Sequence, residues 1–403
     1  MTNLKIIQKE IDGCLKFFEN ATSAEGVAFG LTLDKYPTKN YSASIAASGF
    51  MLAGQIIAVE LGSKIREKAE DFCFKVITEL SKLERYHGFF YHFYDCRTGE
   101  ILNEHTEVST IDTALLIAGA VTAGEYFGGR VKEVADKLYA DVEFEHFGDK
   151  VRKQIIMSYR KTKGYSANNW DLYAEQLILY VLAAGAPNPK YRLGREYYQN
   201  MGKQVGRYGE HEYIFSWTGS LFTHQFSHAF VDFRRTQDYG GTDWFANSVT
   251  ASKASRQYCI DNPNNYKMYD SNSWGLSSSA GPQGYQGRYG TPPSGNNDTE
   301  HRDDGTIALY AAPSSIVFTP DESIAALKNF YKNKTLIGEY GLYAAFNKNV
   351  DWVGEHYLGI DKGITLLMLA NYLNGCVWKA FAKSEYVKNG LKEIGKKKIQ
   401  EQH

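Results

Sequence analysis

The chain has 403 residues, of which 45 are Lys or Arg and 46 are Asp or Glu, so its formal net charge is −1. A charge this close to zero argues against a strongly basic surface, and we expect neither a nucleic acid nor a membrane partner. Aromatic residues make up 14% of the chain, with 29 Tyr and 22 Phe. Rings in such numbers can line a carbohydrate cleft, although a Tyr-rich core would give the same figure.

The five cysteines are scattered without paired spacing, so we expect reduced thiols and no disulfide framework. Residues 1–13 lack the long apolar core of a secretory signal and have the pattern of an amphipathic helix. No stretch reaches the ~18 uninterrupted apolar residues of a membrane span. We therefore expect a soluble, cytoplasmic protein.

Two kinds of predicted helix alternate along the chain. Residues 4–18 have helical apolar spacing, residues 41–61 are nearly free of charge, and residues 64–83 carry their charges on one face. After a predicted hairpin over 88–99, the uncharged kind recurs from 110 and over 177–184, 307–312 and 363–373, and the polar kind over 131–139, 190–198 and 322–331. An uncharged helix must be buried, whereas a helix with one polar face lies outside.

About six such pairs predict a ring of inner helices wrapped by outer ones, although no sequence repeat is visible. The predicted fold is all-α, an (α/α)6 toroid with small β-hairpins and long loops at the cleft. No Pro-rich linker divides the chain, so we expect one domain over 1–403. The loop 268–304 is rich in Ser, Gly, Pro and Asn, but its Trp274, Tyr285 and Tyr289 argue against disorder and favour a functional loop.

The stretch 105–120 places two acids, Glu107 and Asp112, at the mouth of a helix that is apolar all round. Ser109 is the predicted N-cap, and Asp112 stands where a capping box has its acidic partner. The free N–H groups and dipole of the helix N-terminus favour the charged form of Asp112, which suits a base or a stabilising carboxylate. The alternative is that Asp112 only caps the helix.

A second acid precedes an apolar run in the stretch 170–182. Asp171 is the predicted cap and Glu175 the acid one turn inside, on the same buried face as Leu179. Apolar and aromatic surroundings should raise the pKa of Glu175 towards that of a general acid. The alternative is a hydrogen-bonded acid of the core.

Further polar side chains stand in apolar contexts. His224 and His228 have the i, i+4 spacing of a zinc helix, but Gln225 replaces the Glu that a metalloprotease needs, so we expect no metal. Asp304 and Asp361 each precede a buried helix and either cap it or line the cleft. No phosphate-binding loop and no nucleophile elbow is present, and we expect no cofactor. Paired carboxylates in an aromatic cleft are what glycosidic bond hydrolysis requires.

The order of these segments resembles the glycoamylase-like domain of glycoside hydrolase family 144, the bacterial β-1,2-glucanases, which is related to a domain of cyclic β-1,2-glucan synthases. The matching segments run in collinear order over most of the chain: 47–50, 88–93, 107–116, 173–175, 224–234, 274–276, 304–306, 340–347 and 358–361. The resemblance implies an (α/α)6 toroid and metal-independent, inverting hydrolysis of β-1,2-linked glucose polymers. Asp112, Glu175 and Asp361 match acids that line the cleft of the family.

Two positions depart from the family pattern. Lys362 stands where a Gln is expected, and Leu309 stands where a Pro is common. A cation beside Asp361 would lower the pKa of that acid and favour a base or binding role.

The hypothesis from the sequence is an enzyme that hydrolyses β-1,2-glucan or sophorooligosaccharides. Glu175 would be the general acid, and Asp112 or Asp361 would position the attacking water. Rings that would stack on glucose are Trp217, Trp274 and Tyr289, and groups that would hold hydroxyls are Glu107, Gln225, His228, Asp232, Arg234 and Asp304. The alternatives are exo-acting release of sophorose, transglycosylation, or a glycan-binding protein without catalysis. A toroidal lyase or a terpenoid-cyclase-like enzyme would need a metal or acid-rich motif that the sequence lacks.

Overall fold

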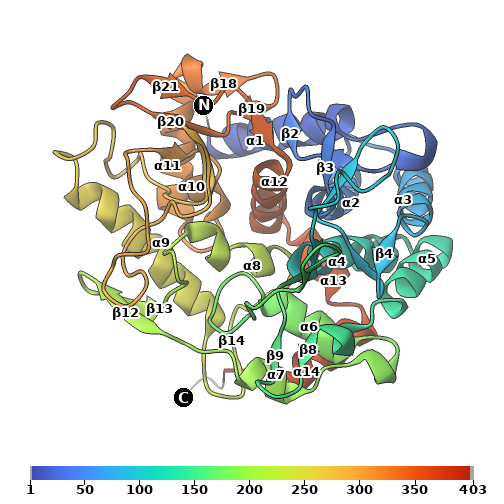
Figure 1. The fold of residues 1–403 in the computed structure, drawn as a ribbon. Coiled ribbons are helices and arrows are strands. Elements are labelled where there is room, and N and C mark those ends of the chain that lie inside the picture. The colour runs from blue at the N-terminus through green and yellow to red at the C-terminus, as the bar shows by residue number, and fades with distance from the viewer. Residues whose placement is uncertain (1, 400–403) are drawn as a thin grey trace.

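The computed structural model describes residues 2–399 and is mostly helical (Figure 1). Its helices are α1 (Asn3–Ala21), α2 (Ile45–Glu60), α3 (Arg66–Leu80), α4 (Thr110–Phe127), α5 (Gly129–Ala140), α6 (Leu177–Gly185), α7 (Arg195–Gln199), α8 (Phe226–Phe230), α9 (Trp244–Asp261), α10 (Ala311–Ser314), α11 (Pro320–Lys332), α12 (Gly359–Leu373), α13 (Cys376–Phe381) and α14 (Glu385–Glu393). None of the described helices is both long enough and apolar enough to cross a membrane.

The strands are short and pair antiparallel in sheets of two or three. They are β1 (Thr32–Leu33), β2 (Lys35–Tyr36), β3 (Ser42–Ser44), β4 (Arg85–Tyr86), β5 (Phe89–Phe90), β6 (Phe93–Asp95), β7 (Val108–Ser109), β8 (Gly148–Asp149), β9 (Gln154–Ile155), β10 (Ser158–Arg160), β11 (Gly164–Tyr165), β12 (Val205–Tyr208), β13 (His211–Ile214), β14 (Thr236–Gln237), β15 (Ser279–Gly281), β16 (Gly284–Gln286), β17 (Ile307–Ala308), β18 (Ile337–Gly338), β19 (Gly341–Leu342), β20 (Ala345–Asn347), β21 (Trp352–Val353), β22 (Tyr357–Leu358) and β23 (Lys397–Lys398). They build the connections between the helices.

The mostly buried helices form a closed circuit. α2 packs against α4, α4 against α6, α6 against α8, α8 against α12, and α12 back against α2, while α10 also packs on α12. Figure 1 shows these helices around the centre of the molecule, with α1, α3, α5, α9 and α11 towards its edge. The predicted division into buried helices and helices with a polar outer face is therefore present.

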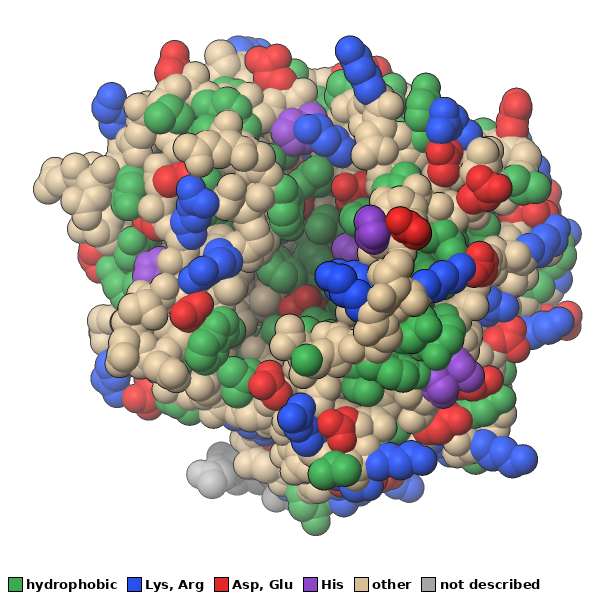
Figure 2. All heavy atoms as spheres, in the orientation of Figure 1, with side chains coloured by type: hydrophobic (Ala, Val, Ile, Leu, Met, Phe, Trp, Pro, Cys, Tyr) green, Lys and Arg blue, Asp and Glu red, His purple; other side chains and the backbone are tan. Residues whose placement is uncertain are grey.

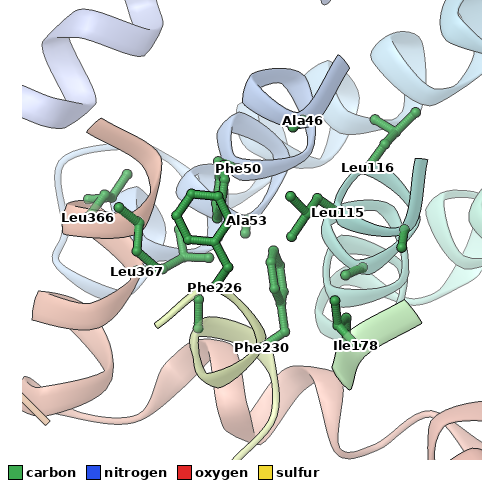
Figure 3. Packing of buried hydrophobic residues seen from close by; sticks show 14 of the residues in the cluster. Ala46, Phe50, Ala53, Leu115, Leu116, Ile178, Phe226, Phe230, Leu366 and Leu367 are labelled. Atoms are coloured by element: carbon green, nitrogen blue, oxygen red, sulfur yellow. The ribbon is translucent and has the colours of Figure 1, made fainter. Parts of the chain in front are cut away.

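The centre of this circuit is filled by apolar side chains (Figure 3). The Phe50 ring of α2 lies edge-on to Phe226 of α8 at 5.6 Å between centroids and stacks on Phe230 at 5.8 Å. Leu115 of α4 and Leu366 of α12 complete the cluster, and all five side chains are buried. Since burying each such side chain is worth about 1.5–3 kcal/mol, this cluster is a principal source of cohesion between the inner helices.

Glycines let α2 and α4 approach closely. A Cβ atom added to Gly119 of α4 would lie 2.0 Å from the Gly49 carbonyl oxygen of α2. Side chains at these two positions would force the helices apart. Close packing of α2 against α4 therefore requires glycine at both positions.

The structure corrects three expected elements and contains a long helix that was not expected. α6 begins at Leu177, so Asp171 is not its cap and Glu175 lies in the turn before it. Residues 307–312 form strand β17 and the start of a four-residue helix, α10, where a longer buried helix was expected. Only Arg195–Gln199 of the predicted helix 190–198 is α-helical. The long helix α9 was not predicted from the sequence.

Small polar residues explain why α9 was missed. Its buried face includes Ser248, Ser252 and Ser255, which do not produce an apolar period. The Ser252 hydroxyl donates to the Ser248 carbonyl oxygen at 2.9 Å, so it is satisfied within the helix and can be buried.

Candidate active site

A cavity of about 610 Å³ opens on the face where α4, α6 and α12 begin. Figure 2 shows this hollow, with acidic side chains inside it. It is lined by Asp34, Lys35, His92, Phe93, Ala280, Gly281, Gly284, Tyr285, Trp352, Val353, Gly354, Glu355, His356, Leu358 and Ile360. None of the three predicted catalytic acids is itself a lining residue, but Asp112 lies 3.7 Å from the lining residue His92, and Asp361 directly follows the lining residue Ile360.

Asp112 lies in the first turn of α4. The Ser109 side chain caps the helix by accepting from the Asp112 backbone N–H at 3.2 Å, which confirms the predicted cap. The same hydroxyl donates to Asp112 Oδ2 at 2.5 Å, and His92 Nδ1 lies 3.7 Å from that oxygen. Both contacts hold the carboxylate as an acceptor beside the cavity-lining His92.

Glu107 lies close to this pair. Its carboxylate forms an ion pair with Arg160 at 2.6 Å and lies 4.0 Å from His92 Nδ1. The His92 backbone N–H also donates to the Glu107 carbonyl oxygen at 2.8 Å. His92 is therefore positioned by Glu107 and faces Asp112.

Glu175 lies half-buried in the turn before α6. Ser227 of α8 fixes this turn, because its hydroxyl donates to the Glu175 carbonyl oxygen at 2.6 Å and accepts from the Ile178 N–H at 2.9 Å. Burial, with a smaller contribution from the charge of Asp112, raises the pKa of Glu175 to about 7. The predicted direction of this pKa shift is confirmed. The predicted position of Glu175 inside the helix is wrong, because the helix begins two residues later.

Asp361 lies in the first turn of α12 and is 5% exposed. Its Oδ2 has no hydrogen-bond partner among the described residues. Burial and the charge of Asp34 raise the pKa of Asp361 well above its usual range, and Lys362 opposes this only partly. Lys362 lowers this pKa as expected, but burial and the charge of Asp34 outweigh it, so the net shift is upward. The Lys362 Nζ atom itself pairs with the buried Glu10 at 2.8 Å.

A fourth acid, Asp34, was missed from the sequence. It lies between β1 and β2, and its carbonyl oxygen accepts from the N–H of Gly359, the first residue of α12, at 2.8 Å. Burial raises the pKa of Asp34, the charge of His92 opposes this, and the charge of Asp112 adds to it. No local pattern marks Asp34, since only the tertiary contact with α12 brings it to the cavity.

Tyr285, on the hairpin of β15 and β16, also lines the cavity. The pKa of its hydroxyl is raised first by burial and then by the charges of four acids, Asp361, Asp34, Glu175 and Asp112. The charges of all four acids therefore act on this one phenol. Tyr285 belongs to the loop that the sequence marked as functional, but its selection over Tyr289 needed the structure.

Several predicted sugar-binding residues lie away from the cavity because they are buried. Trp274 is 0% exposed and Tyr289 is 2% exposed, so neither ring face is open to a ligand. Tyr289 instead donates to Asp304 Oδ2 at 2.5 Å, and Asp304 also accepts from the Thr306 N–H at 3.0 Å. The prediction that these three residues contact glucose is therefore corrected. Their side chains pack or form hydrogen bonds inside the protein.

Gln225 and His228 are also core residues. Gln225 donates to the Ala311 carbonyl oxygen at 2.8 Å and to Ser315 at 2.9 Å. His228 lies 3.0 Å from the Ser248 hydroxyl, and burial lowers its pKa to about 3. Both tie α8 to its neighbours, so neither is placed to hold a sugar hydroxyl.

Asp232, Arg234 and Trp217 do not line the cavity either. Asp232 accepts two hydrogen bonds from the Arg234 guanidinium, at 2.9 and 2.8 Å, and its carbonyl oxygen binds Lys396 near the end of the described chain. Trp217 is 38% exposed in the loop after β13. Of the predicted binding residues, Glu107 is the one brought next to the acids.

The chain matches a known protein family. Residues 167–385 match the model of the Glycoamylase family, described as "putative glucoamylase". This match covers more than half of the chain, which belongs to that family.

The chain is also similar to an individual protein with a curated activity. The chain is 27% identical over 408 residues to an exo-β-1,2-glucooligosaccharide sophorohydrolase (non-reducing end) of Parabacteroides distasonis, an alignment that covers 91% of this chain and 54% of that protein. The chain thus spans about half the length of this curated relative.

Two solved structures are similar over nearly the whole chain. One is an endo-β-1,2-glucanase of Chitinophaga pinensis in complex with sophorotriose and glucose, with 25% identity, a TM-score of 0.86, and coverage of 98% of this chain and 99% of that one. The other is a β-1,2-glucanase of Parabacteroides distasonis, with 25% identity, a TM-score of 0.87, and coverage of 98% and 60%.

Proposed function

We propose that the chain is a glycoside hydrolase that cleaves β-1,2-linked glucose polymers or sophorooligosaccharides, with inversion and within a single (α/α)6 toroidal domain over 1–403. The closed circuit of α2, α4, α6, α8 and α12, with α10 on α12, supports the toroid. Relatives named as sophorohydrolase and β-1,2-glucanase support the substrate.

The observation that carries this proposal is that acids from separate elements lie in or beside the lining of one cavity: Asp34 lines it, Asp112 lies 3.7 Å from the lining residue His92, and Asp361 directly follows the lining residue Ile360. Hydrolysis of a glycosidic bond needs one carboxylic acid to protonate the leaving oxygen and a carboxylate to activate water. Glu175, whose pKa is raised to about 7, holds a proton near neutrality and suits the acid role. We assign Glu175 as the general acid.

Asp112 and Asp361 are the two candidates for the base. Asp112 accepts from the Ser109 hydroxyl, and its Oδ2 lies 3.7 Å from Nδ1 of the cavity-lining His92. Burial and the charge of Asp34 raise the pKa of Asp361 and so favour its protonated form. These environments support Asp112 as the group that positions water and Asp361 as a group that holds a sugar hydroxyl.

Hydrolysis of linear glucans with different linkages tests the proposal. New reducing ends should form from β-1,2-glucan and not from β-1,3- or β-1,4-glucan, and NMR of the first product should show the inverted anomer. Saturable binding of β-1,2-glucan without new reducing ends would identify a glycan-binding protein instead.

Release of sophorose from chain ends is the second candidate activity, since a relative carries that name. Product chain lengths separate the two: an endo enzyme gives mixed oligosaccharides early, whereas an exo enzyme gives sophorose from the start. Products longer than the substrate would indicate transglycosylation.

The pH dependence follows from the acid role of Glu175. Only its protonated form can donate, so kcat/KM on sophorotriose should fall as pH rises through about 7, the pKa of Glu175. A pH profile measured with an aryl sophoroside should lack this basic limb, because a good leaving group needs little protonation. A basic limb shared by both substrates would remove the basis for assigning it to Glu175.

A further inference from the structure

A second cluster of polar side chains lies outside the cavity. His87, Glu143 and His146 offer ligand atoms that all lie within 4.8 Å of one another, and all three residues are half-buried. His87 Nδ1 lies 2.6 Å from Glu143 Oε2, and the His87 and His146 rings stack at 3.3 Å between centroids. The acids of the proposed active site take no part in it.

Two separate connections build this cluster. His87 is in the turn between β4 and β5, whereas Glu143 and His146 belong to the connection after α5. His87 has φ +50°, a conformation that residues other than glycine rarely adopt, and its carbonyl oxygen accepts from the Glu143 N–H at 3.1 Å. The backbone thus holds the two imidazoles and the carboxylate on one side of the turn.

Glu143 has few positively charged groups around it. Among residues 2–399, no Lys or Arg makes an ion pair with Glu143, whose carboxylate instead contacts the His87 imidazole. Arg85 pairs with Asp141 at 3.4 Å instead. Glu145, next to His146, has a buried carboxylate oxygen without a hydrogen-bond partner. A cation at this place would compensate these acids.

A surface pocket reaches Glu143, one member of the cluster. It has a volume of about 550 Å³ and is lined by Leu83, Arg85, Gly88, Ala140, Asp141, Glu143, Asn188 and Tyr191. On the other side, the Tyr165 hydroxyl contacts His146 Nε2, and the Tyr86 ring packs edge-on against His87. In metal sites, a hydrogen-bond partner at the ring nitrogen that does not bind the metal orients the imidazole.

We propose that His87, Glu143 and His146 bind a divalent transition metal, with Zn²⁺ as the best match. Two imidazoles and one carboxylate are a common protein ligand set for Zn²⁺ and leave a coordination position for water. The bound ion links the β4–β5 turn to the connection after α5. Its role is separate from glycan hydrolysis, which proceeds at the other site without it.

Calorimetric titration of tag-free, EDTA-treated protein with Zn²⁺ tests this site. One equivalent should bind, and Glu143→Gln and His146→Ala should each weaken the Kd by at least about tenfold. His105→Ala is the matched control, because His105 is an exposed histidine 3.6 Å from Glu104 and away from the cluster. The control should bind Zn²⁺ as the wild type does.

Thermal unfolding gives an independent readout. Zn²⁺ should raise the Tm of the wild type and of His105→Ala, and this shift should be lost in the other two variants. The absence of binding up to millimolar Zn²⁺, or equal affinity in all four proteins, would overturn the proposal. Because both measurements use no glycan, neither result depends on the activity of the cavity.

Discussion

Glu175→Gln is expected to lower kcat on sophorotriose by about 10²- to 10⁴-fold, the usual contribution of a general acid. The amide has the shape of the carboxylic acid but cannot transfer a proton. Substrate binding should change little, because the turn that holds Glu175 is fixed through its backbone by Ser227. Initial rates and KM, measured on purified variants, check this result.

An aryl sophoroside provides the decisive control for Glu175→Gln. Its leaving group departs without help from an acid, so the variant should retain far more activity on it than on sophorotriose. The Tm should match that of the wild type, as it should for Glu212→Gln, a surface variant that removes only an exposed pair with Arg207. Near-wild-type turnover of sophorotriose would reject the acid assignment.

Lys362→Met is expected to destabilise the protein by about 3–5 kcal/mol, the cost of leaving one member of a buried ion pair without its partner. Lys362 is 5% and Glu10 1% exposed at their side chains, and their charged atoms lie 2.8 Å apart. Glu10 also accepts from the Tyr331 hydroxyl at 2.7 Å and the Leu342 N–H at 3.1 Å. The pair joins α1 to α12. The free energy of unfolding in urea measures the loss.

Two further variants separate charge burial from loss of packing. Glu10→Gln combined with Lys362→Met should recover most of the stability, because the neutral amide can still accept from Tyr331 and Leu342. Lys388→Met, which breaks the exposed pair with Glu385, should cost less than about 1 kcal/mol. If the double variant is no more stable than Lys362→Met, the buried charge is not the cause.

Features of the structure that depend on neighbouring residues in the chain could be predicted from the sequence. The cap at Ser109 precedes an apolar run, so both the start of α4 and the position of Asp112 could be read from neighbouring residues. The burial of α2, α4 and α12 followed from their lack of charge. Glu175 was identified with its raised pKa, but its turn depends on Ser227, 52 residues away, and no local pattern contains that contact.

The sequence did not show which aromatic residues are buried and which line the cavity. Composition predicted many rings, but Trp274 and Tyr289 point into the protein while Tyr285 lies in the cavity. These side chains share one Gly-rich loop without a period that distinguishes inside from outside. Asp34 and the pair of Glu10 and Lys362 were missed for a related reason, because each acquires its role from a partner hundreds of residues away.

The apolar cluster of Phe50, Phe226 and Phe230 sets a limit on how the cavity can be used. Leu115 and Leu366 of the same cluster come three and five residues after Asp112 and Asp361 on their helices. The side chains of this cluster fill the space between the inner helices, so a sugar chain cannot pass through the middle of the helix circuit (Figure 3). If the chain cleaves glucans as proposed, both products of a cut therefore have to leave on the side of the circuit from which the substrate entered.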